Sequence, residues 1–76
     1  MSFESVMEKS ILIKFGQRVR ELRAERNLTQ QQLADISGLH KNYIGMVERG
    51  ERNPSLVNID ILARSFEISV SDFFLK

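Results

Sequence analysis

Residues 29–50 read TQQQLADISGLHKNYIGMVERG, and this stretch decides the fold. Counted from residue 30, it places a small residue fifth, a glycine ninth, and branched aliphatics fifteenth and eighteenth: Ala34, Gly38, Ile44 and Val47. Ala34 leaves room for a second helix to cross close by, and Gly38 can take the positive φ that ends a helix. Ile44 and Val47 are about one turn apart and hold the second helix down. The spacing predicts two short helices joined by a tight turn.

This arrangement is typical of a helix-turn-helix motif, here spanning about residues 30–49. Because Ile44 and Val47 face inward, four residues are left on the opposite side of the second helix: Lys41, Asn42, Gly45 and Met46. In such motifs the second helix usually enters the major groove of DNA. The sequence therefore predicts that this side of the helix faces double-stranded DNA.

The chain has 76 residues, which fit one compact domain and leave no room for a separate ligand-binding domain. It contains no cysteine, so neither a disulfide framework nor a thiolate metal site is available. Its stability must come from packing, within the chain or shared across an oligomer. We expect a single domain over residues 1–76 with no metal and no cofactor.

No apolar run approaches the length of a membrane span, and the N-terminal segment lacks the order of a signal peptide. We therefore expect a cytoplasmic protein without a membrane partner. The net charge is +1, but residues 14–52 carry eight lysines and arginines against five acidic residues. A mildly basic middle fits a DNA-facing surface, although a solvated helical surface explains many of these charges equally well.

Apolar residues recur every three or four positions, which predicts an all-α chain of five helices. The first helix, expected over about residues 11–26, buries the stripe Phe15, Val19 and Leu22. Asn27 then supplies a left-handed stop. Residues 1–10 have apolar spacing too, and the sequence leaves open whether they lengthen this helix or fray.

The other four helices have recognisable ends. Their N-caps are Thr29, with Gln32 in a capping box, then His40 or its neighbour, Ser55 and Ser69. The residues expected to face inward or line the turn are Leu33, Ala34, Ile36, Leu56, Ile59, Leu62, Ala63 and Phe66. The last helix carries Val70, Phe73 and Phe74. The C-terminal third thus presents more large apolar side chains than a monomer of this size easily hides.

Residues 22–56, LRAERNLTQQQLADISGLHKNYIGMVERGERNPSL, resemble the Cro and repressor-type helix-turn-helix family, also called the XRE family. The resemblance implies a compact five-helix lambda-repressor-like DNA-binding domain. Residues 38–59, followed by a short helix with two phenylalanines, are most similar to the controller proteins of bacterial restriction-modification systems. That resemblance implies a small homodimeric transcriptional regulator. Free-standing phage and chromosomal repressors share all of these features and stay an alternative.

The resemblance implies base contacts from one side of the second motif helix. Lys41 suits guanine O6 and N7, and Asn42 suits adenine. Gly45 lets the helix approach a base pair at a cost of about 1 kcal/mol of helix propensity, unless it is a packing accident. Met46 either contacts a thymine methyl or fills space as a partly buried side chain.

Phosphate contacts are implied for residues at helix starts and in the loop after the motif: Gln30, His40, Tyr43, Arg49, Arg52 and Ser55. Gln30 is also expected to brace the start of the second motif helix, with simple solvation or capping as the alternative. For Tyr43, a half-buried structural role competes. His40 is the only histidine, and without cysteine partners a metal role for it is remote.

In the family an arginine of the first helix pairs with the glutamate at the end of the recognition helix, which here implies a salt bridge between Arg23 and Glu48. A homodimer on a near-palindromic operator is also implied, with its two recognition helices about 34 Å apart. The candidate dimer-interface residues are Phe66, Ile68, Val70, Phe73 and Leu75. Core packing within one subunit is the competing account for Phe66 and Phe73.

Other classes of function fit less well. An enzyme needs a nucleophile, an acid–base pair or a metal cluster, and a lone histidine with scattered carboxylates supplies none, so we do not expect catalysis. A protein-interaction module such as an antitoxin stays open, because a fold alone does not fix function. Repression and activation are both open, and activation would add RNA polymerase as a partner.

Overall fold

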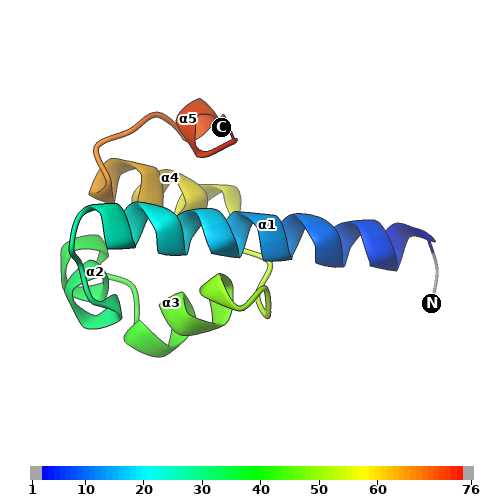
Figure 1. The fold of residues 1–76 in the computed structure, drawn as a ribbon, viewed down its shortest axis with the longest axis horizontal. Coiled ribbons are helices and arrows are strands. Elements are labelled where there is room, and N and C mark those ends of the chain that lie inside the picture. Colours follow the sequence, from blue (N-terminus) through cyan, green and yellow to red (C-terminus); the bar gives the residue numbers. More distant parts are fainter. Residues whose placement is uncertain (1–2, 75–76) are drawn as a thin grey trace.

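The structure, a computed structural model, describes residues 3–74. These residues form five α-helices and no strand: α1 Phe3–Glu25, α2 Gln30–Ser37, α3 Lys41–Glu48, α4 Leu56–Ser65 and α5 Val70–Phe74. α1 crosses the molecule, with α2 and α3 on one side of it and α4 and α5 on the other (Figure 1). The predicted all-α fold of five helices is therefore confirmed.

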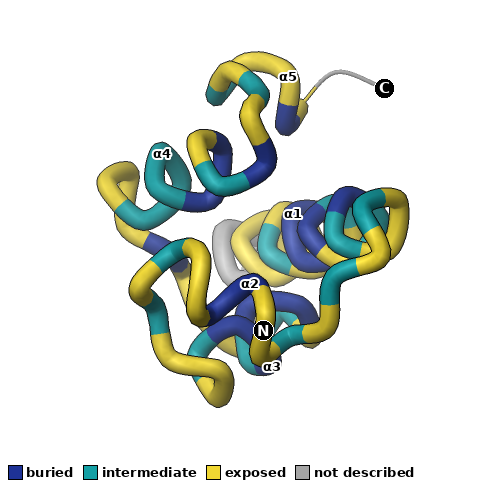
Figure 2. Tube along the Cα trace, turned by 90° about the vertical axis from the view of Figure 1, so that its left-hand side faces the viewer, coloured by how far each residue is buried: buried dark blue, intermediate teal, exposed yellow. Residues whose placement is uncertain are grey.

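The core lies where the five helices meet. Its buried apolar residues are Phe15, Val19, Leu22, Leu33, Ala34, Ile44, Val47, Leu62, Ala63, Phe66 and Phe73. Figure 2 shows the buried stretches of α1 to α4 turned toward one another. The short α5 is attached through Phe73, whose ring lies 5.0 Å from that of Phe15 and 6.0 Å from that of Phe66.

The N-cap of α2, the turn after α2 and the stop after α1 are as predicted. Thr29 accepts a bond from the Gln32 amide while the Gln32 side chain accepts one from the Thr29 amide, which completes the capping box. Gly38 has φ 77° and donates its N–H to the Ala34 carbonyl at 2.9 Å, so it turns the chain from α2 toward α3. Asn27 has φ 54°, as expected for the left-handed stop after α1.

Three expectations change. α1 begins at Phe3 rather than near Ile11, so the question about the first ten residues is answered for 3–10: they lengthen the helix. Ile36 is 56% exposed, because at about 100° per residue it lies on the side of Leu33 that points away from Ala34, beyond the buried face of α2. Leu56 is 75% exposed, because it is the first residue of α4 and the core contacts begin a turn later.

α1 and α3 approach each other closely at Gly16. A Cβ atom on this glycine would lie 2.7 Å from the carbonyl oxygen of Glu48, closer than real Cβ contacts come. Since the obstacle is backbone, it cannot move aside without shifting α3. Gly16 was not predicted to lie at this contact, although a glycine inside a helical pattern costs helix propensity and can have a packing reason.

Candidate nucleic-acid interface

α3 is held by its buried side and is exposed at its first turn. Ile44 and Val47 are both buried in the core. Lys41 and Asn42, at the N-terminus of α3, are exposed. His40 is the N-cap, and among the described residues its side chain makes no capping hydrogen bond. The first turn of α3 therefore presents a cationic side chain and an amide side chain on a helix whose position is fixed by packing.

The rest of the predicted DNA-facing side is less open than the sequence suggested. Met46 is half-buried and Gly45 is buried. A Cβ on Gly45 would lie 3.2 Å from Nη1 of Arg49 and 3.6 Å from the side-chain amide atoms of Gln30. Gly45 is therefore covered by side chains in the unbound protein, and its contact with a base pair stays a prediction. Periodicity placed the backbone correctly but could not show that two long polar side chains lie over it.

A network of polar side chains ties α3 to α1 and α2. Glu48 accepts hydrogen bonds from Arg23 Nε at 2.7 Å, Arg23 Nη2 at 3.1 Å and Gln30 Nε2 at 3.1 Å. Arg20 Nε lies 3.6 Å from the same carboxylate. The salt bridge expected between Arg23 and Glu48 is thus present. Gln30 braces the end of α3 rather than its start.

The charge state of this network follows from its contacts. Burial raises the pKa of Glu48, but the bonds from Arg23 and Gln30 and the nearby guanidinium charges outweigh it, so this pKa lies below its ordinary value. The hydrogen bond to Glu48 raises the pKa of Arg23. Both groups are therefore charged near neutral pH.

Tyr43 and Ser55 join α3 to the start of α4. The hydroxyl oxygen of half-buried Tyr43 accepts a bond from Asn58 Nδ2 at 3.0 Å. Ser55 Oγ accepts one from the Asn58 amide at 3.1 Å and caps α4 as predicted. Because its oxygen is the acceptor, the Tyr43 hydroxyl keeps its proton to donate. The role of Asn58 was not predicted, since no sequence motif marks a pairing between residues so far apart.

Several of the residues expected to bind phosphate surround α3. His40, Arg52 and Ser55 are exposed. Arg49 is exposed too, but its guanidinium is paired with Glu51, with Nε 2.9 Å from Oε2. No role was predicted for Glu51.

The candidate dimer residues divide into two groups. Phe66 and Phe73 are 1% and 2% exposed within the single chain, so the competing account, core packing within one subunit, holds for both. Ile68 and Val70 are half-buried against the core. Leu75 lies outside the described residues.

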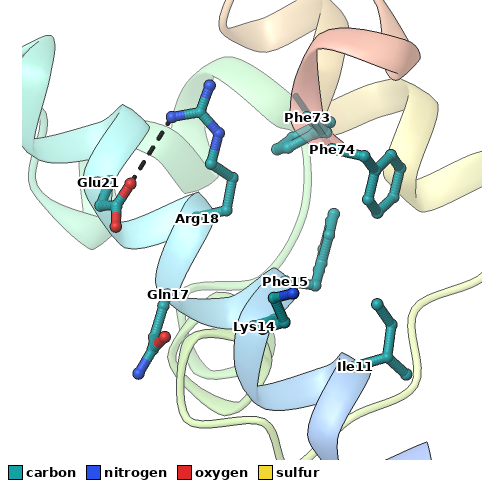
Figure 3. A pocket seen from close by; sticks show the side chains of 8 residues that line it. All are labelled: Ile11, Lys14, Phe15, Gln17, Arg18, Glu21, Phe73 and Phe74. Carbon is teal, nitrogen blue, oxygen red and sulfur yellow. Dashed lines mark ion pairs between the residues drawn. The ribbon is translucent and has the colours of Figure 1, made fainter. Parts of the chain in front are cut away.

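Beside α5, a groove of about 390 Å³ runs between α1 and the C-terminal aromatics (Figure 3). Phe15, Phe73 and Phe74 line its apolar wall, and Lys14 and Arg18 lie at its edge. Phe74 is largely exposed there, as are Val6 and Met7 further along α1. The described chain thus has an unpartnered apolar surface away from α3.

Two further searches concern the described residues only. No group of histidine and acidic side chains among them could hold a metal ion. None of the five helices combines the length and apolar character needed to cross a membrane.

Comparisons with known proteins agree with this geometry. The helix-turn-helix family matches residues 19–73. The control protein C.SmaI of Serratia marcescens is 54% identical over 55 residues, which cover 72% of this chain and 66% of that protein. The chain belongs to the helix-turn-helix family of transcriptional regulators, in the XRE branch to which the sequence pointed.

Comparison with solved structures gives more specific similarities. The crystal structure of the restriction-modification controller protein C.AhdI from Aeromonas hydrophila matches with a TM-score of 0.83 and 52% identity, covering 86% of this chain and 98% of that one. The regulator of biofilm formation SinR, solved in complex with DNA, matches with a TM-score of 0.74 and 28% identity over 79% of this chain and 97% of its own. The resemblance to controller proteins seen in the sequence is confirmed.

Proposed function

We propose that this chain is a homodimeric, operator-binding regulator of transcription that serves as the controller protein of a restriction-modification system. The observation that carries the proposal is α3. Its inner side is fixed by Ile44 and Val47, while Lys41 and Asn42 are exposed at its first turn. A rigid helix with polar side chains at its N-terminal end is what base reading in a major groove requires. The DNA complex of the similar regulator SinR supports this use of the fold.

Specificity is assigned to the first turn of α3. Lys41 donates to the acceptors of guanine, and Asn42 offers the donor and acceptor pair that matches adenine. Gly45 and Met46 lie one turn further along and complete this set of base-facing positions. Whether Gly45 meets a base pair directly depends on the positions of the Arg49 and Gln30 side chains, which cover it in the free protein.

Affinity is assigned to contacts with the phosphate backbone. The proposed donors are His40, Tyr43, Arg52, Ser55 and Gln30. Tyr43 can donate its hydroxyl proton because Asn58 donates to its oxygen. The capped start of α4 adds free backbone N–H groups and the positive end of a helix dipole. These contacts set the register of α3 in the groove without reading sequence.

A dimer is part of the proposal because one recognition helix reads only a few base pairs. We place the interface on the C-terminal segment around Ile68 and Val70, with the exposed ring of Phe74 beside it. Phe66 and Phe73 support this surface from the core. A two-fold axis then sets two copies of α3 about 34 Å apart, one turn of DNA. The site of action is the cytoplasm, and contact with RNA polymerase is needed only if the regulator activates.

The proposal is tested by selecting bound sequences from random duplex DNA with the purified protein at physiological salt. Enrichment of a motif with two-fold symmetry is the expected result. Salt-sensitive binding without an enriched motif would reflect phosphate contacts alone. It would overturn the proposal and favour the protein-interaction module instead.

A further inference from the structure

Arg49 occupies an unusual position at the end of α3. Lys41, Gly45 and Arg49 are spaced four residues apart and so lie along one side of the helix. The guanidinium of Arg49 lies back over Gly45, since a Cβ there would be 3.2 Å from Nη1. Long helical side chains point toward the helix N-terminus. The charge of Arg49 is therefore carried about one turn closer to the first turn of α3 than its own Cα.

The end of α3 brings Glu51 to this guanidinium. The Gly50 amide donates to the Val47 carbonyl at 3.0 Å, and the Glu51 amide donates to the Met46 carbonyl at 2.8 Å. With Gly50 at φ 76°, these bonds form a Schellman motif, which turns the chain back beside the helix. Glu51 Oε2 then accepts from Arg49 Nε at 2.9 Å, and Oε1 accepts from Nη2 at 3.2 Å.

The two bonds from Glu51 engage one edge of the guanidinium and leave its outer end for another acceptor. A guanidinium carries five N–H donors in a rigid fork. The edge formed by Nε and Nη2 is bound to Glu51, so the donors that remain for another acceptor are those of Nη1, which lies over Gly45, and the second N–H of Nη2. Two parallel donors of this kind match O6 and N7 of guanine.

We propose that Arg49 reads a guanine in the operator and that Glu51 is a positioning residue that orients its guanidinium over Gly45. This inference rests on the proposed DNA-binding function. It replaces the phosphate contact that the sequence suggested for Arg49. A phosphate contact changes the affinity for every DNA sequence alike, whereas a guanine contact also sets the preference at one base pair, and the two-donor fork of arginine makes that contact more specific than an ammonium group does. The two roles therefore predict different results when charge and orientation are changed separately.

Two substitutions separate charge from orientation. Glu51→Gln removes a negative charge near DNA but weakens the hydrogen bonds that orient the Arg49 guanidinium. Arg49→Lys keeps the charge and removes the fork. Matched controls come from the exposed pair of α4, in which Arg64 Nε lies 3.0 Å from Asp60 Oδ2: Asp60→Asn and Arg64→Lys make the same changes of charge and shape there.

The experiment measures affinity by fluorescence anisotropy for the selected operator, for operators with single base-pair replacements, and for a scrambled duplex. We expect Glu51→Gln and Arg49→Lys to lose about tenfold to a hundredfold of preference at the same G·C pair of each half-site. Glu51→Gln should bind the scrambled duplex at least as tightly as Asp60→Asn does, because both remove one negative charge.

Contrary results are distinguishable. If Glu51→Gln tightens binding to operator and scrambled duplex alike, and Arg49→Lys leaves every base preference unchanged, Arg49 is a phosphate contact and the inference is overturned. If the wild-type protein selects no motif, the proposed function fails and this assignment fails with it. Loss of preference in Arg64→Lys as well as in Arg49→Lys would also contradict the role given to Arg49.

Discussion

Arg23 of α1 and Glu48, the last residue of α3, form a two-point ion pair, with Nε 2.7 Å from Oε2 and Nη2 3.1 Å from Oε1. The Glu48 side chain is fully buried, and that of Arg23 is 18% exposed. Arg23 Nη1 also donates to the Leu28 carbonyl at 2.8 Å, at the entry to α2. One side chain thus fixes α3 and the chain leading into α2 relative to α1.

We expect Glu48→Ala to lower the free energy of unfolding by about 3 kcal/mol or more, because it leaves the Arg23 charge without its buried partner. Chemical denaturation measures the loss. The control is Asp60→Ala, which breaks an exposed ion pair and should lower the free energy of unfolding by less than about 1 kcal/mol. Equal effects of the two substitutions would rule out a structural role for the buried pair.

The same pair predicts a dependence of stability on pH. The folded-state pKa of Glu48 lies below its ordinary value of 4.5, so its contribution is fully present above that pH. It is lost as the pH falls through the folded-state pKa. Arg23 stays protonated in the folded and unfolded states over this pH range, so it adds no pH dependence to the stability. Wild-type melting temperature should therefore fall more steeply below about pH 4.5 than that of Glu48→Gln. Parallel curves for the two proteins would contradict the assignment.

Gly16→Ala should destabilise the protein by roughly 1–3 kcal/mol or more, because the new methyl group meets the backbone of α3. This destabilisation is opposite in sign to the effect of helix propensity, which favours alanine over glycine by about 1 kcal/mol. Thermal unfolding followed by circular dichroism measures the change. Gln17→Ala, at the next and exposed position, is the control. A Gly16→Ala protein as stable as the control would mean that α1 and α3 are further apart than described.

Glu67→Gly should raise the stability. Glu67 has φ 60°, a left-handed conformation that costs a side-chain-bearing residue about 1–2 kcal/mol. Its amide donates to the Arg64 carbonyl at 3.0 Å, and the next amide donates to the Ala63 carbonyl at 3.0 Å, so glycine fits this helix end. We expect a gain of about 0.5–1 kcal/mol in denaturation. Ala24→Gly, in a right-handed helical position, should show the opposite sign.

The parts of the fold that depend on neighbouring residues could be predicted from the sequence. The capping box at Thr29, the turn at Gly38 and the stop at Asn27 are set by side chains within three or four positions. The inward positions of Ile44 and Val47 follow from the helical repeat, and both are buried. The pairing of Arg23 with Glu48 came from the family resemblance, since nothing local links residues in different helices.

What could not be predicted depends on contacts between segments or on long side chains. The exposure of Ile36 and Leu56 depends on how much of each helix its neighbours cover. The burial of Gly45 depends on where Arg49 and Gln30 extend, which periodicity does not describe. The pairing of Glu51 with Arg49 follows from the turn after α3 and has no motif of its own.

The central claim, that the first turn of α3 reads bases, is tested most directly by comparing affinities for the selected operator and a scrambled duplex at physiological salt. For the wild-type protein we expect a ratio on the order of a thousand or more. Lys41→Ala and Asn42→Ala should each remove about 1–3 kcal/mol of that discrimination, each at its own base pair. A wild-type ratio near one, or a ratio unchanged by both substitutions, would contradict the account.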